Sequence, residues 1–106
     1  MPASSRDSRI EHQEGADGGA FYLEQDGRRV GELAYRMDGG MADLHHTEVD
    51  ESLRGKGAGA RLVEAAVQWA RAAHVKLLPT CPYARAVFDK TPRYADVRAS
   101  RHGVSP

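Results

Sequence analysis

A glycine-rich segment with basic side chains is the part of this sequence best suited to bind an anion. It lies between a segment of alternating polarity and a segment of helical periodicity, and it consists of Arg54, Gly55, Lys56, Gly57, Ala58, Gly59 and Ala60. Glycines let backbone N–H groups approach a ligand closely, and the unpaired donors of a first helical turn favour an anion. We therefore expect a phosphate site, to which Arg54, Lys56 and Arg61 add positive charge. The alternative is a flexible turn whose basic side chains are only solvated.

Two widespread phosphate-binding motifs fit this segment poorly. The P-loop requires Gly-Lys followed by Ser or Thr, whereas Lys56 is followed by Gly57. The dinucleotide-binding fingerprint requires an acidic residue about 20 positions further on, and residues 75–80 read VKLLPT with none. Nucleoside triphosphate hydrolysis is therefore disfavoured, and NAD binding is a minor alternative.

His46 and Cys81 are the side chains best suited to proton transfer or nucleophilic chemistry. A histidine titrates near pH 6.5 and can accept a proton, and a thiol can give a proton or take an acyl group. The simpler alternatives are a small buried hydrophobe for Cys81 and a hydrogen-bonded sheet residue for His46. His45 is expected on the opposite face of its strand from His46.

Alternating apolar residues in the first half of the chain predict an antiparallel meander. The expected strands cover residues 20–25, 29–37 and 41–49, and Ile10 marks a weaker candidate for an earlier strand. Asp26-Gly27 is a strong hairpin signal, because both residue types adopt left-handed backbone conformations. In the third run, alternation places four residues on one face, namely Ala42, Leu44, His46 and Glu48.

The second half of the chain has helical periodicity. Apolar residues at three- and four-residue steps predict a helix over residues 58–73, closed by His74. Residues 75–80 are short and apolar enough for a buried strand. A second, shorter helix is expected from Tyr83 to Lys90, because Pro82 suits a first helical turn.

The order of these elements predicts one α+β domain with a mixed sheet. A strand, a helix and a strand in succession form a right-handed crossover, so residues 41–49 and 75–80 should run parallel. The domain is expected over residues 8–99. The small and polar residues of 1–7 and 100–106 predict disordered tails, because they bury too little apolar surface to offset the entropy of ordering.

The composition argues against several functional classes. The 106 residues carry 15 Lys and Arg against 15 Asp and Glu, so a net charge of zero provides no general attraction to nucleic acid. No apolar run approaches the roughly 20 residues of a membrane span, and the first residues lack an apolar signal-peptide stretch. A single Cys cannot form an internal disulfide. We expect a cytoplasmic protein that binds neither nucleic acid nor membranes, and no metal site is predicted.

The glycine-rich segment and its flanking segments resemble the GCN5-related N-acetyltransferases (GNAT). Val49 followed by residues 54–59 is similar to the acetyl-CoA-binding pattern of that family, which is Gln or Arg, two residues, Gly, one residue, then Gly or Ala. The supporting segments are 44–49 (LHHTEV), 79–83 (PTCPY) and 88–94 (FDKTPRY). The resemblance extends from Ile10 to about Val97 and is strongest to a very small single-domain group with bacterial members.

The resemblance implies how acetyl-CoA would be held. The backbone amides from Gly55 to Ala60 would bind the CoA pyrophosphate. The two parallel strands would splay apart near their C-terminal ends, and the pantetheine arm would insert between them beside Val49. Tyr83, Lys90 and Arg93 are weaker candidates for contacts with the adenosine and the 3′-phosphate.

The resemblance also implies a catalytic pair. The thioester would lie close to His46 and Cys81, which similar small acetyltransferases are thought to use. His46 would accept the proton of the amine, and Cys81 would either protonate the leaving CoA thiolate or carry the acetyl group as a thioester. Many larger members have a catalytic Tyr at the position that corresponds to Phe88, which has no proton to give.

The acceptor site is expected to be shallow and open. Larger relatives have helices between their first two strands that wall the acceptor groove, and Gln13–Gly19 is too short for them. The acceptor would be a protein lysine or N-terminus, or a small amine, on a monomer or in a groove shared by a homodimer. We expect an acetyl-CoA-dependent N-acetyltransferase. The alternatives are a CoA or acyl-CoA binding module without efficient turnover and a nucleic-acid accessory domain, for which the composition shows no basic face.

Overall fold

The computed structural model describes residues 8–99, so the disordered tails expected at 1–7 and 100–106 lie outside the described residues. The strands are β1 (Ser8–Glu14), β2 (Gly18–Gln25), β3 (Arg28–Asp38), β4 (Met41–Val49) and β5 (Lys76–Pro79). The helices are α1 (Ala58–Ala73) and α2 (Pro82–Lys90), with the short 3-10 helices η2 (Glu51–Leu53) and η3 (Pro92–Val97). Over the described residues, no helix is long and apolar enough to cross a membrane.

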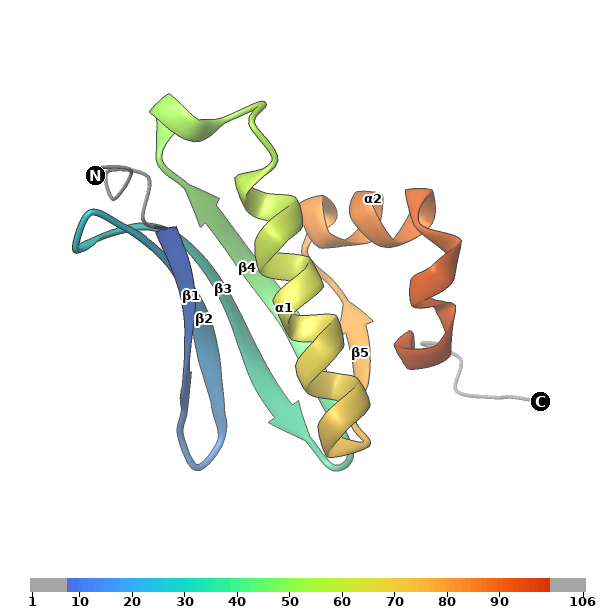
Figure 1. Ribbon diagram of the computed structural model, residues 1–106. Coiled ribbons are helices and arrows are strands. Elements are labelled where there is room, and N and C mark those ends of the chain that lie inside the picture. The colour runs from blue at the N-terminus through green and yellow to red at the C-terminus, as the bar shows by residue number, and fades with distance from the viewer. Residues whose placement is uncertain (1–7, 100–106) are drawn as a thin grey trace.

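The strands form a mixed sheet of the expected topology (Figure 1). They lie in the order β1-β2-β3-β4-β5, with antiparallel pairing up to β4 and parallel pairing between β4 and β5. The β2–β3 hairpin turns at Asp26 and Gly27, whose φ angles of 54° and 82° confirm the left-handed turn expected of this dipeptide. The α+β fold class is therefore confirmed.

Helix α1 covers one face of the sheet. Its residues Leu62 and Val63 are fully buried, as are Leu33, Leu44 and Leu77 on three of the strands. Helix α2 and η3 add buried residues to the same core and lie beside α1 (Figure 1). Within the described residues, no α-helix covers the opposite face, so we call that side the open face of the sheet.

A β-bulge in β4 changes the faces expected for its residues. Tyr35 pairs with Leu44 and Ala34 pairs with His46, so His45 is an extra residue without a partner in β3. Directly paired residues share a face, and a bulge shifts the alternation by one. The prediction that Leu44 and His46 share a face is therefore wrong, since Leu44 faces α1 and His46 lies on the open face.

The bulge also reassigns the residues that follow it. Thr47 pairs with the buried Leu33, so it lies on the α1 side of the sheet. Glu48 pairs with Glu32 on the open face. The end of β4 thus directs Thr47 towards the core side and His46 with Glu48 towards the open side.

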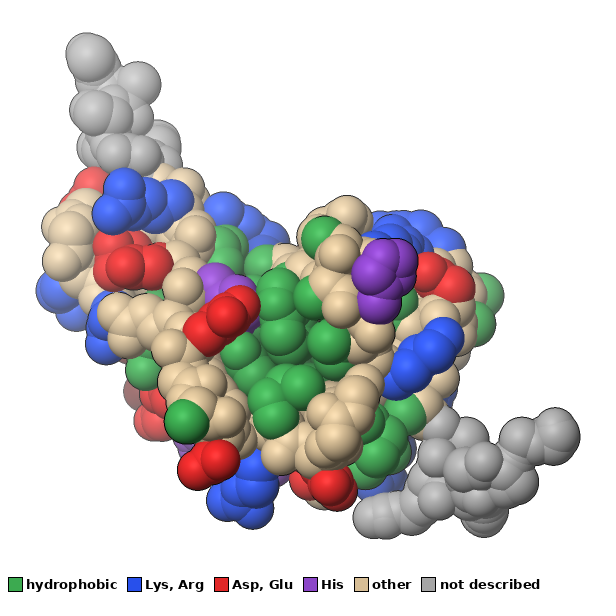
Figure 2. Space-filling model, turned by 90° about the horizontal axis from the view of Figure 1, so that it is seen from below, with side chains coloured by type: hydrophobic (Ala, Val, Ile, Leu, Met, Phe, Trp, Pro, Cys, Tyr) green, Lys and Arg blue, Asp and Glu red, His purple; other side chains and the backbone are tan. Residues whose placement is uncertain are grey.

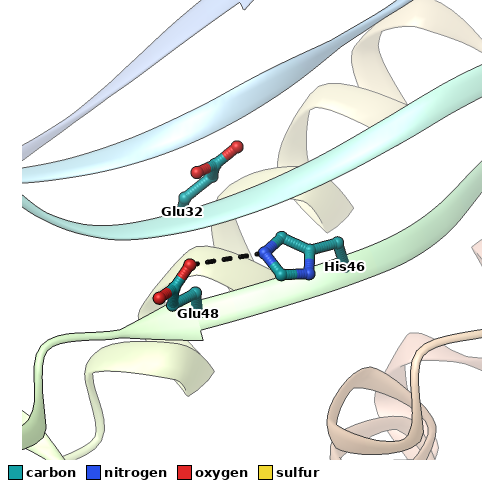
Figure 3. Close-up of side chains that lie close together, drawn as sticks. All are labelled: Glu32, His46 and Glu48. Atoms are coloured by element: carbon teal, nitrogen blue, oxygen red, sulfur yellow. Dashed lines mark ion pairs between the residues drawn. The ribbon is translucent and has the colours of Figure 1, made fainter.

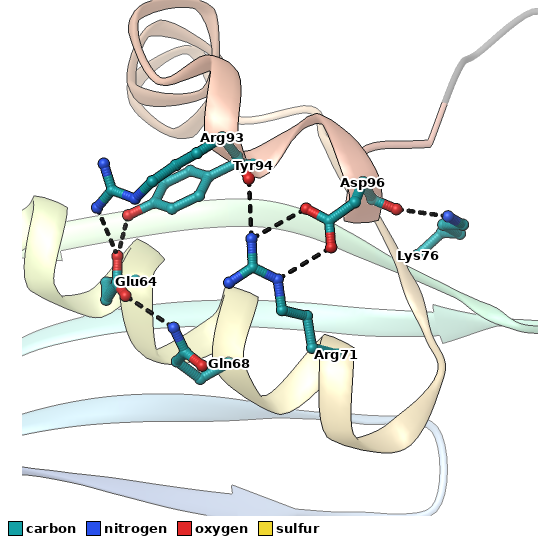
Figure 4. A network of polar contacts seen from close by, with 7 residues as sticks. All are labelled: Glu64, Gln68, Arg71, Lys76, Arg93, Tyr94 and Asp96. Atoms are coloured by element: carbon teal, nitrogen blue, oxygen red, sulfur yellow. Dashed lines mark hydrogen bonds and ion pairs between the residues drawn. The ribbon is translucent and has the colours of Figure 1, made fainter.

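A polar network attaches η3 to α1 (Figure 4). Arg71 donates to both carboxylate oxygens of Asp96 at 2.9 Å and to the carbonyl oxygen of Arg93 at 2.8 Å. The Tyr94 hydroxyl donates to Glu64. This hydrogen bond is the main reason why the pKa of Glu64 lies below its ordinary value. The network holds the C-terminal part of the described chain against the main helix.

Replacing Tyr94 with Phe should remove the hydrogen bond to Glu64 and keep the ring contact with Phe88. Because the folded-state pKa of Glu64 is lowered, this bond stabilises the fold above the unfolded pKa of about 4.3, and the stabilisation is lost as the pH falls through the folded pKa. The Glu64 side chain is 40% exposed. Solvent screens the interaction of this partly exposed carboxylate, so we expect the unfolding free energy to fall by only about 1 kcal/mol at pH 7 and to change little near pH 3. Urea denaturation at both pH values measures the effect, and equal losses would contradict it.

Aromatic side chains attach β1 to the core. His12 stacks on Phe21 with ring centroids 4.0 Å apart and meets Trp69 edge-on at 5.0 Å. Its Nε2 lies 2.6 Å from the Tyr35 hydroxyl. Figure 2 shows hydrophobic side chains gathered in a hollow at the end of the molecule away from the glycine-rich loop. These contacts explain why β1 is a full strand although Ile10 is its only strong apolar signal.

Candidate active site

Strands β4 and β5 are paired over only the first part of β4. Parallel pairing joins residues 41–44 to 76–79, and within the described residues the rest of β4 has no β5 partner. Beyond Pro79 the chain turns, and the Cys81 N–H donates to the Leu44 carbonyl oxygen at 2.8 Å. The two strands therefore diverge after Leu44, as the resemblance implies. The divergence leaves the edge of β4 beside the start of α2.

The glycine-rich loop forms the N-terminus of α1. Gly55 and Gly57 have φ angles of 81° and 82°, a region in which glycine is unstrained. Gly57 is the N-cap residue, and the Arg61 N–H makes the first helical hydrogen bond to its carbonyl oxygen at 3.0 Å. The N–H groups of residues 58–60 consequently have no partner within the helix. With the helix dipole they favour an anion at this end.

The basic side chains of the loop are accessible. Arg54 and Lys56 are exposed, and Arg61 donates to the Ser8 hydroxyl at 3.0 Å. Lys56 and Arg54 are therefore free to turn towards a phosphate, whereas Arg61 is in contact with β1. All three side chains keep their positive charge near the loop, and Arg61 is the one held towards β1.

Tyr83 connects the loop to α2. A Cβ atom added to Gly59 would lie 2.6 Å from the ring of Tyr83, so the ring lies directly against the backbone of the first helical turn of α1. The Tyr83 side chain is still 42% exposed. Since Cys81 is the N-cap residue of the helix that carries Tyr83, this contact brings the first turn of α1 close to the start of the helix that Cys81 caps.

Replacing Gly59 with Ala should move the Tyr83 ring without unfolding the protein. The exposed ring can swing into solvent, and the helix-propensity gain of about 0.5–1 kcal/mol offsets the lost contact, so the unfolding free energy should change by less than about 1 kcal/mol. The Tyr83 ring-proton shifts and a thermal melt measure both effects. The control is Gly40→Ala, where an added Cβ meets nothing within 4 Å. Unchanged ring shifts in Gly59→Ala would contradict the contact.

Cys81 is buried, and its sulfur is hydrogen-bonded to a hydroxyl group of β4. It is 7% exposed, and its Sγ lies 3.3 Å from Thr47 Oγ1. Burial raises the pKa of the thiol, but hydrogen bonds from the Thr47 hydroxyl and from the N–H groups of Ala84, Tyr83 and Thr47 outweigh burial, so the pKa lies below its ordinary value. A helix N-terminus acts in the same direction. The sulfur is therefore prepared to carry negative charge.

His46 lies with two carboxylates on the open face (Figure 3). Its Nε2 is 3.5 Å from Glu48 Oε1, and the imidazole is half-exposed. Glu32, opposite Glu48 in the register, completes a group whose ligand atoms lie within 4.8 Å of one another. Exposed acidic groups are common without a cation, so this arrangement alone indicates no metal site. The partner of the Cys81 sulfur on β4 is Thr47, and the structure does not bring His46 and Cys81 into direct contact.

The remaining candidate residues are placed at different distances from the loop. Val49 ends β4 and is half-buried, so it lies on the divergent strand as expected. Lys90 ends α2, about 12 Å along the helix axis from Pro82 at 1.5 Å per residue. Arg93 is paired with Glu64 at 3.3 Å. The structure therefore groups Val49 with the divergent strands and does not bring Lys90 or Arg93 to the loop through any described contact.

Thr47 was not identified from the sequence. A strict alternation places it on the face opposite Leu44, away from the expected thioester position. The sequence contains one signal for the correct face of Thr47. The apolar residues Ala42 and Leu44 occupy even positions and Val49 an odd one, so all three can face the core only if one residue is inserted between Leu44 and Val49.

The fold and this site define the class of the protein. The diverging parallel strands and the glycine-opened helix are the arrangement expected of a GNAT-type N-acetyltransferase. A family model described as "GCN5-related N-acetyl-transferase" matches residues 20–97. The chain therefore belongs to the GNAT family of acyltransferases.

Solved structures agree with this assignment. A GCN5-like putative N-acetyltransferase from Staphylococcus aureus is 29% identical, with a TM-score of 0.65 over 87% of this chain and 92% of that one. The ribosomal-protein-S18-alanine N-acetyltransferase of Escherichia coli is 21% identical, with a TM-score of 0.61 over 73% of this chain and 53% of its own. The IAA acetyltransferase of Bacillus cereus is 18% identical, with a TM-score of 0.62 over 78% and 74%. The last two support the fold alone. No curated protein matches in sequence.

Proposed function

We propose that this protein transfers an acetyl group from acetyl-CoA to an amine. The observation that carries the proposal is the contact between Tyr83 and Gly59, which joins the anion-binding turn of α1 to the helix whose N-cap is Cys81. A molecule with a pyrophosphate at one end and a thioester at the other matches this arrangement. Acetyl-CoA is such a molecule.

Each part of acetyl-CoA has a proposed contact. The pyrophosphate binds the free N–H groups of residues 58–60, with charge from Arg54 and Lys56. The pantetheine amides pair with the edge of β4 that β5 leaves free, because a strand edge offers unused donors and acceptors. The arm then ends beside Cys81. Tyr83 lies between the two ends and contacts the cofactor along its length.

The proposed chemistry proceeds through Cys81 in two balanced steps. The thiolate attacks the acetyl carbonyl carbon, a new bond to Cys81 Sγ forms, and the bond to the CoA sulfur breaks, so that CoA leaves as a thiolate that takes a proton from solvent. The neutral amine then attacks the acetyl-Cys81 carbonyl carbon, the bond from that carbon to Sγ breaks so that Cys81 leaves as a thiolate, and the nitrogen gives its extra proton to water. The lowered pKa of the Cys81 thiol favours the first step, since the thiolate is the nucleophile.

The acceptor amine is proposed to enter from the open face of the sheet. Helix α1 covers the other face, and β1 is joined to β2 by a tight turn in which Gly15 N–H donates to Gly18 O at 2.6 Å. No helix walls the open face within the described residues, so a protein lysine, an N-terminus or a small amine can approach. His46 lies on this face with Glu48 beside it and is proposed to take the proton of the incoming ammonium group before the neutral amine moves on to the acetyl group at Cys81.

Release of free CoA in the presence of amines tests the proposal. The protein is incubated with acetyl-CoA and a panel of lysine peptides, N-terminal peptides and small amines, and both CoA and the acetylated amine are followed by mass spectrometry. We expect stoichiometric formation of the two products with at least one amine class. Tight binding of acetyl-CoA without product from any amine would contradict transfer and favour a CoA-binding module.

A further inference from the structure

The bulge in β4 brings one side chain to Cys81 that strict alternation would direct away. His45 is the inserted residue, and after it Thr47 pairs with Leu33 on the α1 side of the sheet. Because β5 ends at Pro79, the edge of β4 at Thr47 faces the start of α2 instead of another strand. As a result, the hydroxyl of Thr47 reaches the Cys81 sulfur, with 3.3 Å between Oγ1 and Sγ.

We propose that Thr47 is a positioning residue for Cys81, whose hydroxyl holds the sulfur in place and stabilises it as a thiolate. The inference rests on the proposed function only for the role of the thiolate as the nucleophile that attacks the acetyl group. The position of the sulfur follows from two hydrogen bonds of Cys81. The backbone N–H of Cys81 donates to the Leu44 carbonyl oxygen at 2.8 Å, and its Sγ lies 3.3 Å from Thr47 Oγ1.

A hydroxyl group suits both protonation states of the sulfur. In the neutral thiol, the S–H of Cys81 donates to Thr47 Oγ1. When the thiol loses its proton to solvent, the hydroxyl can rotate and donate its own hydrogen to the sulfur, because a Thr hydroxyl is both donor and acceptor. Thr47 therefore keeps one hydrogen bond to the sulfur in each state and remains neutral. A methyl group in its place would provide neither.

Charged side chains do not explain the environment of the sulfur. The causes that shift the pKa of Cys81 are burial and hydrogen bonds, with no contribution from a charge. The buried face of α1 is apolar. The titratable and charged side chains on the neighbouring parts of β4, β5 and α2 are Asp43, His45, His46, Glu48, Lys76, Tyr83 and Arg85. The bulge places His46 and Glu48 on the open face, so the neutral donors around the sulfur dominate.

The test is the pH dependence of the Cys81 thiolate in the full chain, without acetyl-CoA. Since Cys81 is the single Cys of the sequence, both the ultraviolet absorbance of the thiolate and the rate of iodoacetamide alkylation report on it alone. In Thr47→Val, we expect the midpoint of thiolate formation at Cys81 to rise by about one pH unit. A shift of this size corresponds to the loss of one hydrogen bond to a charged group. Below both midpoints, alkylation should slow about threefold, because higher intrinsic nucleophilicity offsets part of the lost thiolate.

Two variants separate this role from a general structural effect. Thr47→Ser keeps the hydroxyl and should restore the wild-type midpoint, even if it is somewhat less stable than Thr47→Val. Thr91→Val removes a hydroxyl that donates to the Val87 carbonyl oxygen at 2.7 Å at the far end of α2, and it should leave the midpoint unchanged. An unchanged midpoint in Thr47→Val, or the same shift in Thr91→Val, would overturn the inference.

The outcome is distinguishable from failure of the proposed function. If acetyl-CoA neither binds nor acetylates Cys81 but the midpoint shifts in Thr47→Val, the proposed transfer fails and the role of Thr47 in holding the thiolate stands. If Cys81 is acetylated at the wild-type rate in Thr47→Val and its midpoint is unchanged, the role of Thr47 fails and the proposed transfer stands.

Discussion

Gly57→Glu should abolish the stabilisation that CoA gives to the folded protein. A ligand at 100 times its Kd adds about 2.7 kcal/mol, which corresponds to a rise in Tm of about 10 °C or more for a domain of this size. In the variant, a carboxylate at the N-cap of α1 would occupy the position of the pyrophosphate and repel it. Thermal melts with and without CoA and acetyl-CoA measure the loss.

The matched control for this variant is Gly39→Glu. Gly39 lies in the turn between β3 and β4, has a φ of 67°, and, like Gly57, has no atom within 4 Å of an added Cβ. Both substitutions therefore introduce the same charge and a similar backbone strain. We expect both variants to be less stable than the wild type and only Gly39→Glu to respond to CoA. A full response in Gly57→Glu would contradict the phosphate site at α1.

Cys81→Ser should eliminate covalent acetylation of the protein and slow acetylation of the amine by about 100-fold or more. A serine hydroxyl is a much weaker nucleophile than a thiolate, so the first step of the proposed route is lost. The fold should survive, because Ser is a favoured N-cap residue and Cys81 occupies the N-cap of α2. Intact mass after brief exposure to acetyl-CoA measures the adduct, and product formation with a responsive amine measures the rate.

The control for this experiment is the response to CoA itself. Cys81→Ser keeps the loop and the divergent strand edge, so its thermal stabilisation by CoA should equal that of the wild type. If the variant acetylates amines at the wild-type rate and the wild type shows no adduct at any time, transfer is direct and the covalent route is wrong, while the cofactor site stands.

Local signals account for the parts of the fold that the sequence predicts well. The apolar stripe of α1 and the loop before it depend on residues close in the chain, and so does the hairpin at Asp26 and Gly27. Strand β1 is harder to predict, because it is held by contacts of His12 with rings from three other elements. Such contacts between distant segments leave no periodic pattern in β1 itself.

The β-bulge at His45 is the feature of the candidate site that simple alternation does not predict. Alternation assumes an unbroken register, and the bulge at His45 breaks it, which exchanges the positions expected of His46 and Thr47. The residue types at the site could be identified, because a lone Cys and a glycine-rich turn stand out in a sequence. Which side chain touches the Cys81 sulfur depends on a single inserted residue, and the pairing of β3 with β4 identifies that residue as His45.

Titration of isotope-labelled protein with acetyl-CoA, followed residue by residue through the backbone amide signals, tests the central claim most directly. We expect the largest changes at the N–H groups of residues 57–60, with further changes along 45–49 and at 81–84, where the strands diverge. Absence of changes at 57–60, or changes confined to the open face around Glu32 and His46, would show that the cofactor does not bind at the N-terminus of α1 and would contradict the proposed site.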